Sequence, residues 1–182
     1  MQRPLILFSF ALAVVTLACG GDKGTTPPPV PKTITFEGDL AGTKENPPNT
    51  TTQGQGHFKI ILDTSTNVLT WDVTVSGLLA NISNGHIHGP AGAGANAGVI
   101  LNFNPASNQI PGSTFTGFGS ANNGRAQGSL TLSTAVIAPG TNGGPPVTGD
   151  SLKKLLLGGQ TYVNVHTTQN PGGEIRAQII KP

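Results

Sequence analysis

Two segments decide the fold: HFKIILD at residues 57–63 and LTWDVTVS at residues 69–76. In both segments apolar and polar side chains alternate with a period of two, which is typical of a β-strand with one buried face. The four residues between the segments, TSTN at residues 64–67, have the length of a hairpin turn. We therefore predict an antiparallel hairpin that presents Phe58, Ile60 and Trp71 to a core.

Similar patterns continue on both sides of this hairpin. Further strands are predicted at residues 33–40, 83–88, 98–103, 124–132, 160–167 and 174–180, separated for the most part by Gly, Pro and Asn clusters. One short helix is predicted within residues 148–159, begun by a cap at Asp150 or Ser151 and docked on the core through Leu152, Leu155 and Leu156. About eight short strands and one helix indicate an all-β, antiparallel sandwich or barrel.

The first 18 residues have the pattern of a signal peptide. Arg3 precedes an almost unbroken apolar run from Leu5 to Leu17, which is too short to span a bilayer as a mature helix. The run ends in TLACG at residues 16–20, which resembles a bacterial lipobox, where cleavage precedes an acylated cysteine. Cys19 is the only cysteine of the chain, so we expect it to carry the lipid. Ordinary cleavage beside an incidental cysteine is the alternative.

Residues 19–32 are rich in Gly, Thr and Pro and predict a solvated, semi-rigid tether. Two or three acyl chains on Cys19 would anchor the mature protein to a membrane. We therefore expect an exported, lipid-anchored protein of the cell envelope, at the outer membrane or the cell surface. Residues 33–182 form one domain, which must be stabilised by packing because it contains no cysteine. A formal net charge of +2 without a basic run argues against nucleic-acid binding.

Three of the four histidines lie in two segments that are far apart in sequence, NGHIHGP at residues 84–90 and YVNVH at residues 162–166. Because residues two apart share a face of a strand, His86 and His88 project together. If the two strands are neighbours, His166 can join them. Three imidazoles with one open position are a known way to bind zinc or copper. Glu174 would then be a fourth ligand or a partner that fixes a ring tautomer.

A structural polar cluster is the alternative interpretation of the same residues. In that case the imidazoles donate to loop carbonyls or to Glu174, while Asn164, Glu174 and Arg176 form a polar network in which Arg176 pairs with Glu174. The glycine-rich segment at residues 89–98 lacks the residues of a phosphate loop and is interpreted as a flexible connection. No serine lies in a strand–turn–helix elbow, and the few acids show no catalytic spacing, so we expect no enzyme activity.

Four motifs in order carry a family resemblance: residues 42–48 (GTKENPP), 69–78, 85–90, and 162–167 together with 170–179. They resemble the CHRD domain, which is named from chordin and also occurs in bacterial exported proteins. Asn46 and Ala177 depart from the family pattern without touching the histidines. The resemblance implies an extracellular module with a Greek-key-like β-sandwich, immunoglobulin-like or superoxide-dismutase-like, but no established activity for bacterial members. Too few histidines and the missing disulfide argue against dismutase activity.

Two functions therefore remain open. The first is a non-catalytic binding or structural module, anchored to a membrane, with a protein, glycan or matrix ligand. The second is a copper- or zinc-binding protein that uses His86, His88 and His166 and has a redox or metal-handling role. The sequence establishes no cofactor, and metal content of the purified domain separates the two functions.

Overall fold

The computed structural model describes residues 32–103, 113–138 and 146–182. The predicted signal peptide, Cys19 and all of the predicted tether except Lys32 lie outside these residues. None of the helices in the described ranges combines the length and the apolar character that a membrane crossing requires.

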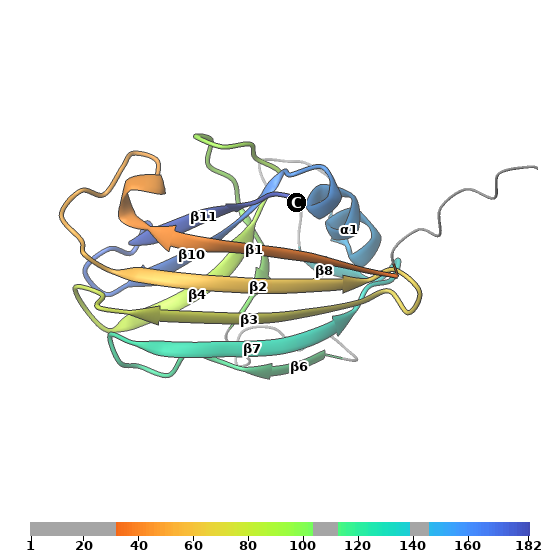
Figure 1. The fold of residues 1–182 in the computed structure, drawn as a ribbon, viewed down its shortest axis with the longest axis horizontal. Coiled ribbons are helices and arrows are strands. Elements are labelled where there is room, and N and C mark those ends of the chain that lie inside the picture. The colour runs from red at the N-terminus through yellow and green to blue at the C-terminus, as the bar shows by residue number, and fades with distance from the viewer. Residues whose placement is uncertain (1–31, 104–112, 139–145) are drawn as a thin grey trace, which may run out of the picture. The chain divides into compact units, whose positions relative to one another are not determined.

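The described residues form an antiparallel all-β domain, as predicted (Figure 1). Its strands are β1 (Thr33–Ala41), β2 (Gln55–Asp63), β3 (Val68–Ser76), β4 (Ile82–His88), β5 (Val99–Asn102), β6 (Ser113–Thr116), β7 (Gly124–Thr131), β8 (Val136–Ala138), β9 (Val147–Thr148), β10 (Thr161–Thr167) and β11 (Ile175–Ile179). A 3₁₀ helix, η1 (Gly42–Lys44), follows β1, and the α-helix α1 (Gly149–Leu157) precedes β10. The eight predicted strands are all present, with boundaries that differ by no more than two residues. The short strands β6, β8 and β9 were not predicted.

Nine strands form one curled sheet in the order β5-β4-β10-β11-β1-β2-β3-β7-β6. Strands β1, β2, β3, β7 and β6 form one layer, and β4, β10 and β11 lie behind it (Figure 1). The chain passes from one layer to the other after β3, β5 and β7. The two layers of the predicted sandwich are joined at one side, because Ala41 of β1 pairs with Arg176 of β11.

The predicted hairpin of β2 and β3 is confirmed, with Asp63 paired to Val68 across a turn of the predicted length. Asp63 Oδ1 accepts hydrogen bonds from the backbone N–H groups of Ser65 (2.8 Å) and Thr66 (3.1 Å). Asn67 closes the turn at φ 56°, a left-handed conformation that asparagine tolerates. The turn residues therefore fix the register that places the apolar side chains of both strands inside.

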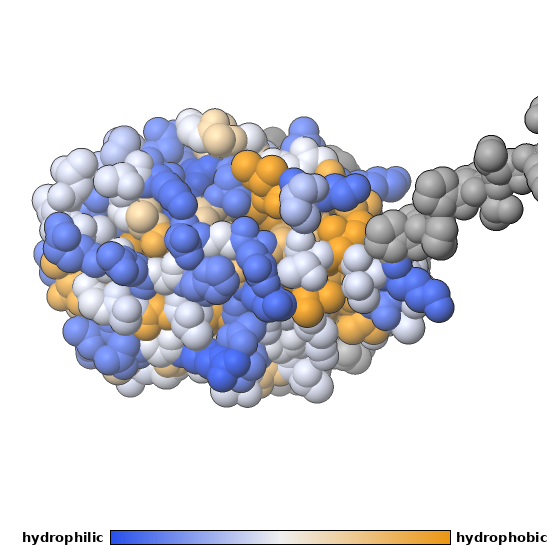
Figure 2. All heavy atoms as spheres, viewed as in Figure 1, coloured by the Kyte–Doolittle hydropathy of each residue, from blue (hydrophilic) through white to orange (hydrophobic). Residues whose placement is uncertain are grey.

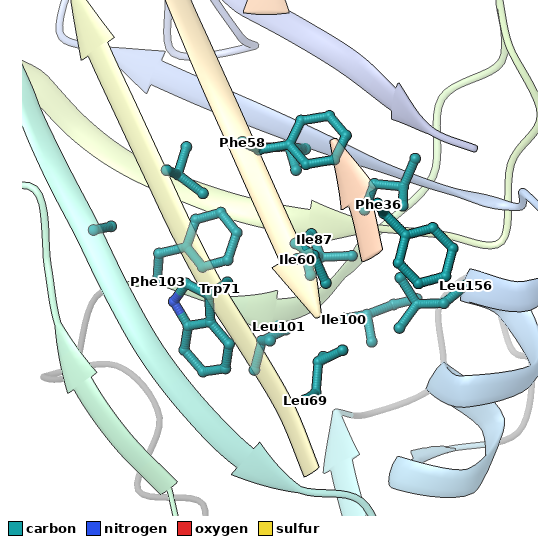
Figure 3. Packing of buried hydrophobic residues seen from close by; sticks show 14 of the residues in the cluster. Phe36, Phe58, Ile60, Leu69, Trp71, Ile87, Ile100, Leu101, Phe103 and Leu156 are labelled. Atoms are coloured by element: carbon teal, nitrogen blue, oxygen red, sulfur yellow. The ribbon is translucent and has the colours of Figure 1, made fainter. Parts of the chain in front are cut away.

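The core lies between the two layers and receives side chains from both (Figure 3). Phe58, Ile60 and Leu69 from the first layer are fully buried, as is Ile87 from β4. The ring of Trp71 lies 5.9 Å from that of Phe103, which links the layers. The opposite face of β1, β2, β3 and β7 is covered largely by hydrophilic side chains (Figure 2).

Helix α1 begins earlier than predicted, and its cap is different. Thr148 is the N-cap, because its side-chain oxygen accepts a hydrogen bond from the backbone N–H of Ser151 at 3.1 Å. Asp150 and Ser151, the predicted caps, lie inside the first turn. Leu152 and Leu156 are fully buried on the core, and Leu155 packs against it.

Removal of this cap has a modest, measurable effect. Thr148→Ala is expected to lower the free energy of unfolding by about 1 kcal/mol, because the N–H of Ser151 loses its acceptor. Urea denaturation measures the change. Thr148→Ser keeps the hydroxyl and is the matched control; an equal loss in both variants would contradict the capping role.

Candidate metal centre

The two histidine-bearing strands are neighbours, as the metal hypothesis required. Strand β4 pairs antiparallel with β10, and Asn164 lies opposite His86 in the register. Ile87 and Val165 are fully buried on the core side. Strand alternation therefore places His86 and His88 of β4 and His166 of β10 on the other face of this layer, as predicted.

The three imidazoles form one cluster. One ring nitrogen from each of His86, His88 and His166 lies within 4.8 Å of the other two. The Nε2 atoms of His88 and His166 are only 3.4 Å apart. Two nitrogens bound to one tetrahedral zinc ion at 2.0–2.1 Å would be separated by about 3.3 Å, so this pair already has the spacing of metal ligands.

Backbone carbonyls fix the protonation of two rings. His88 Nδ1 lies 3.0 Å from the carbonyl oxygen of Ala97, and His166 Nδ1 lies 3.0 Å from that of Pro171. A carbonyl only accepts, so each Nδ1 carries the proton, and in a neutral ring each Nε2 carries a lone pair. The two lone pairs then face each other and neither nitrogen can donate to the other. A cation between them would satisfy both.

Burial keeps the rings neutral, which is the form that binds metals. It lowers the pKa of His86 to about 3, with further lowering by His166 and His88. It lowers the pKa of His88 to about 4 against the opposing hydrogen bond to Ala97, and it also lowers the pKa of His166. His86 is half-buried, but its Nδ1 is out of contact with solvent and has no hydrogen-bond partner among the described residues.

Glu174 is fully buried, but the histidine cluster does not include it. Its carboxylate accepts hydrogen bonds from the hydroxyls of Thr52 and Thr167, both at 2.6 Å. It also accepts from the backbone N–H of Leu79 at 2.7 Å and from the side chain of Asn170 at 3.2 Å. Burial alone would raise the pKa of Glu174, but these hydrogen bonds outweigh it and the pKa is lowered. The carboxylate thus joins loops that are distant in sequence.

Arg176 and Tyr162 form a stack that supports His88 from one side. The guanidinium carbon of Arg176 lies 3.4 Å from the centre of the Tyr162 ring. That ring is parallel to the imidazole of His88, with centroids 4.9 Å apart and an interplanar angle of 5°. Arg176 donates to Asn96 Oδ1 at 3.0 Å and to the carbonyl of Ala95 at 2.8 Å, rather than pairing with Glu174.

The segment at residues 89–98 covers this stack and is held in place by hydrogen bonds. Tyr162 Oη accepts from the backbone N–H of Ala97 at 3.0 Å, and Gln178 donates to the carbonyl of Ala91 at 2.9 Å. The sequence suggested a flexible connection, because small residues dominate it. The structure instead gives it anchoring partners on β10 and β11.

The sequence analysis missed Glu45, which follows η1 and is buried next to Asn164 of β10. Burial raises the pKa of Glu45 to about 7, although Arg176 acts in the opposite direction. The side-chain amide of Asn164 donates a long hydrogen bond of 3.4 Å to Glu45 Oε2. Glu45 Oε1 and Asn164 Oδ1 have no hydrogen-bond partner among the described residues. The only sequence signal was the position of Glu45 within the GTKENPP motif.

Comparison with known proteins gives one match. The family profile described as CHRD domain matches residues 36–179, which include all three clustered histidines, Glu174 and Arg176. No curated protein and no solved structure matches the chain.

Proposed function

The chain belongs to the CHRD domain family, and we propose that it is a non-catalytic, extracytoplasmic module in which His86, His88 and His166 hold one zinc or copper ion. The CHRD assignment supports a binding or structural role. The exported, lipid-anchored location rests on the sequence of residues 1–18 and on Cys19. A protein, glycan or matrix partner would be bound elsewhere on the domain.

The observation that carries the metal proposal is the 3.4 Å approach of His88 Nε2 and His166 Nε2. In both rings the Nδ1–H donates to a backbone carbonyl. This hydrogen bond orients the ring and increases the basicity of its Nε2. A purely structural cluster would be expected to place a donor opposite an acceptor. Facing lone pairs are instead the arrangement that a shared cation stabilises.

Imidazole ligands suit zinc and copper better than they suit magnesium or calcium, which prefer oxygen. Three nitrogens leave one coordination position for water or for a group from a partner. The ion would also join β4 to β10 and, through the two carbonyl bonds, to the loops that contain Ala97 and Pro171. Metal binding should therefore stabilise the folded state.

Metal titration of the domain tests this proposal. After chelator treatment, the domain is expected to bind one equivalent of Zn²⁺ or Cu²⁺ and to melt at a higher temperature with the ion bound. His88→Ala and His166→Ala should each weaken binding by about tenfold or more. Isothermal calorimetry and elemental analysis measure affinity and stoichiometry.

The fourth histidine provides the matched control. His57 is exposed and lies 2.8 Å from Asp39 on the outer face of β1 and β2. His57→Ala should leave the stoichiometry and affinity unchanged. The metal proposal would be wrong if the purified domain bound no stoichiometric ion and if chelator left its melting temperature unchanged.

A further inference from the structure

Arg176 is a buried cation whose hydrogen-bond acceptors among the described residues are all neutral. Its side chain belongs to a residue that is only 1% exposed. Its acceptors are the carbonyl of Ala95 and the amide oxygens of Asn96 and Gln178. Across the described parts of the chain, none of the ion pairs within 4.0 Å includes Arg176. A buried charge is costly unless an opposite charge compensates it.

Glu45 compensates this charge only in part. It is the carboxyl group whose pKa responds to Arg176, but burial raises that pKa to about 7. At neutral pH a substantial fraction of Glu45 is therefore protonated and uncharged. The face of the Tyr162 ring contributes a further, weaker stabilisation of the guanidinium.

Arg176 lines a pocket of about 250 Å³. Among the described residues, its lining consists of two cationic residues, one amide and two small residues, without a carboxylate: Lys44, Ala93, Gly94, Arg176 and Gln178. Lys44 is exposed and donates to the carbonyl of Asp39 at 2.5 Å, so an ammonium group stands near the opening. Glu45 is close enough to Arg176 for its pKa to be lowered by that charge, and the exposed Asp39 is paired with His57.

The walls of the pocket are fixed before any ligand arrives. The carbonyl of Gly94 accepts from the side chain of Asn46 at 2.8 Å, and Asn96 donates to the carbonyl of Asn46 at 2.7 Å. Gly94 has a φ of 77°, a conformation that favours glycine. A preformed site loses little conformational entropy when it binds a ligand.

We propose that the pocket between Lys44 and Arg176 binds the carboxylate group of a small acidic ligand. A guanidinium has five N–H donors, and the protein contacts described above use both donors of Nη2 and one of Nη1. The Nε–H and one Nη1–H therefore remain for carboxylate oxygens. The volume accommodates a small organic acid, an acidic sugar or the end of a peptide, all of which present the same group. The lining of this pocket includes none of the clustered histidines, so the result for carboxylate binding does not depend on whether the metal proposal is correct.

An NMR titration of the ¹⁵N-labelled, chelator-treated domain with sodium acetate tests the proposal, with sodium chloride holding the ionic strength constant. We expect saturable shifts of the Arg176 side-chain Nε–H and of the Gly94 backbone amide. Because Lys44 is exposed, Lys44→Gln should stay folded and weaken acetate binding by about threefold to fivefold. Lys181→Gln, at the exposed C-terminal end, should leave the affinity unchanged.

Arg176→Gln should abolish the saturable shifts, and circular dichroism will show whether that variant is folded. Linear shifts of equal size in wild type and Lys44→Gln would overturn the proposal. A parallel titration with inorganic phosphate tests the ligand class: weaker binding of phosphate than of acetate supports a carboxylate site, and tighter binding overturns that assignment.

Discussion

Replacement of Glu174 by alanine is expected to lower the free energy of unfolding by about 3–5 kcal/mol. The carboxylate is fully buried and accepts hydrogen bonds from Thr52, Thr167, Asn170 and the backbone of Leu79. Alanine leaves these donors without their acceptor in a site that water does not reach. Urea denaturation of the chelator-treated domain measures the loss.

The same variant separates a structural role of Glu174 from a role as metal ligand. If the carboxylate only joins loops, Glu174→Ala destabilises the metal-free domain, and the folded fraction retains its zinc affinity. If it were a ligand, zinc affinity would fall by about tenfold or more while the metal-free stability changed little. Glu37→Ala is the matched control, because Glu37 is an exposed glutamate paired with Lys59 at 2.8 Å. This exposed ion pair contributes little, so Glu37→Ala should leave the free energy of unfolding nearly unchanged.

The behaviour of Glu174 illustrates what strand alternation can and cannot predict. Alternation grouped Glu174 with Arg176 and Gln178, but in the structure Glu174 precedes β11 and, among the described residues, shares no hydrogen-bond partner with either residue. Its partners Thr52 and Leu79 are 122 and 95 residues away in sequence. Nothing in a local pattern identifies such partners, because the loops that carry them are positioned by the whole fold.

Strand β10 is a second case in which strand alternation predicts only part of a residue's environment. The segment Thr161–Thr167 alternates in polarity as a half-exposed strand would, and Val163 and Val165 do point into the core. All seven of its residues are nevertheless buried. Ala97 of the segment at residues 89–98 contacts Tyr162, and Glu45 contacts Asn164, so both side chains lie in a polar interior rather than in solvent. Periodicity predicts which face a residue takes, but not what covers that face.

Local patterns were sufficient for the scaffold of the site. The hairpin of β2 and β3 follows from two alternating segments and a turn of fixed length. The convergence of His86, His88 and His166 required only correct parity and the pairing of β4 with β10. Strands β8 and β9 have three and two residues, which is too short for a periodic signal. Glu45 was missed because its environment depends on the packing of η1 beside β11.

The metal-free domain is expected to lose stability as the pH falls from about 6.5 to about 4.5. The unfolded chain has histidines with ordinary pKa values near 6.5, whereas in the folded domain the pKa is about 3 for His86, about 4 for His88 and lowered for His166. Throughout this range the unfolded state binds protons that the folded state does not. Acidification therefore favours unfolding, with up to three protons contributing.

Glu45 acts in the opposite direction over the same range. Its pKa is raised from 4.5 to about 7 in the folded domain, so the folded state takes up a proton there that the unfolded chain does not. The one proton taken up by folded Glu45 offsets only part of the up to three protons taken up by the unfolded histidines, so the net effect of acidification is still a loss of stability. The net difference of up to two protons corresponds to a steepest slope of about 3 kcal/mol per pH unit. Glu174 adds to the loss only below the range, because its lowered pKa favours the folded state above the unfolded value.

Urea midpoints measured at several pH values with chelator present test this balance, and two variants should change the slope in opposite directions. His88→Asn removes one buried imidazole and should make the loss of stability shallower. Glu45→Gln removes the opposing proton and should make it steeper. A wild-type slope that is flat or reversed between pH 6.5 and 4.5 would mean that the imidazoles are not held neutral by burial. The low pKa values are also what keeps the Nε2 lone pairs of His88 and His166 free for a cation at neutral pH, so the slope tests the electrostatic basis of the metal centre without any metal.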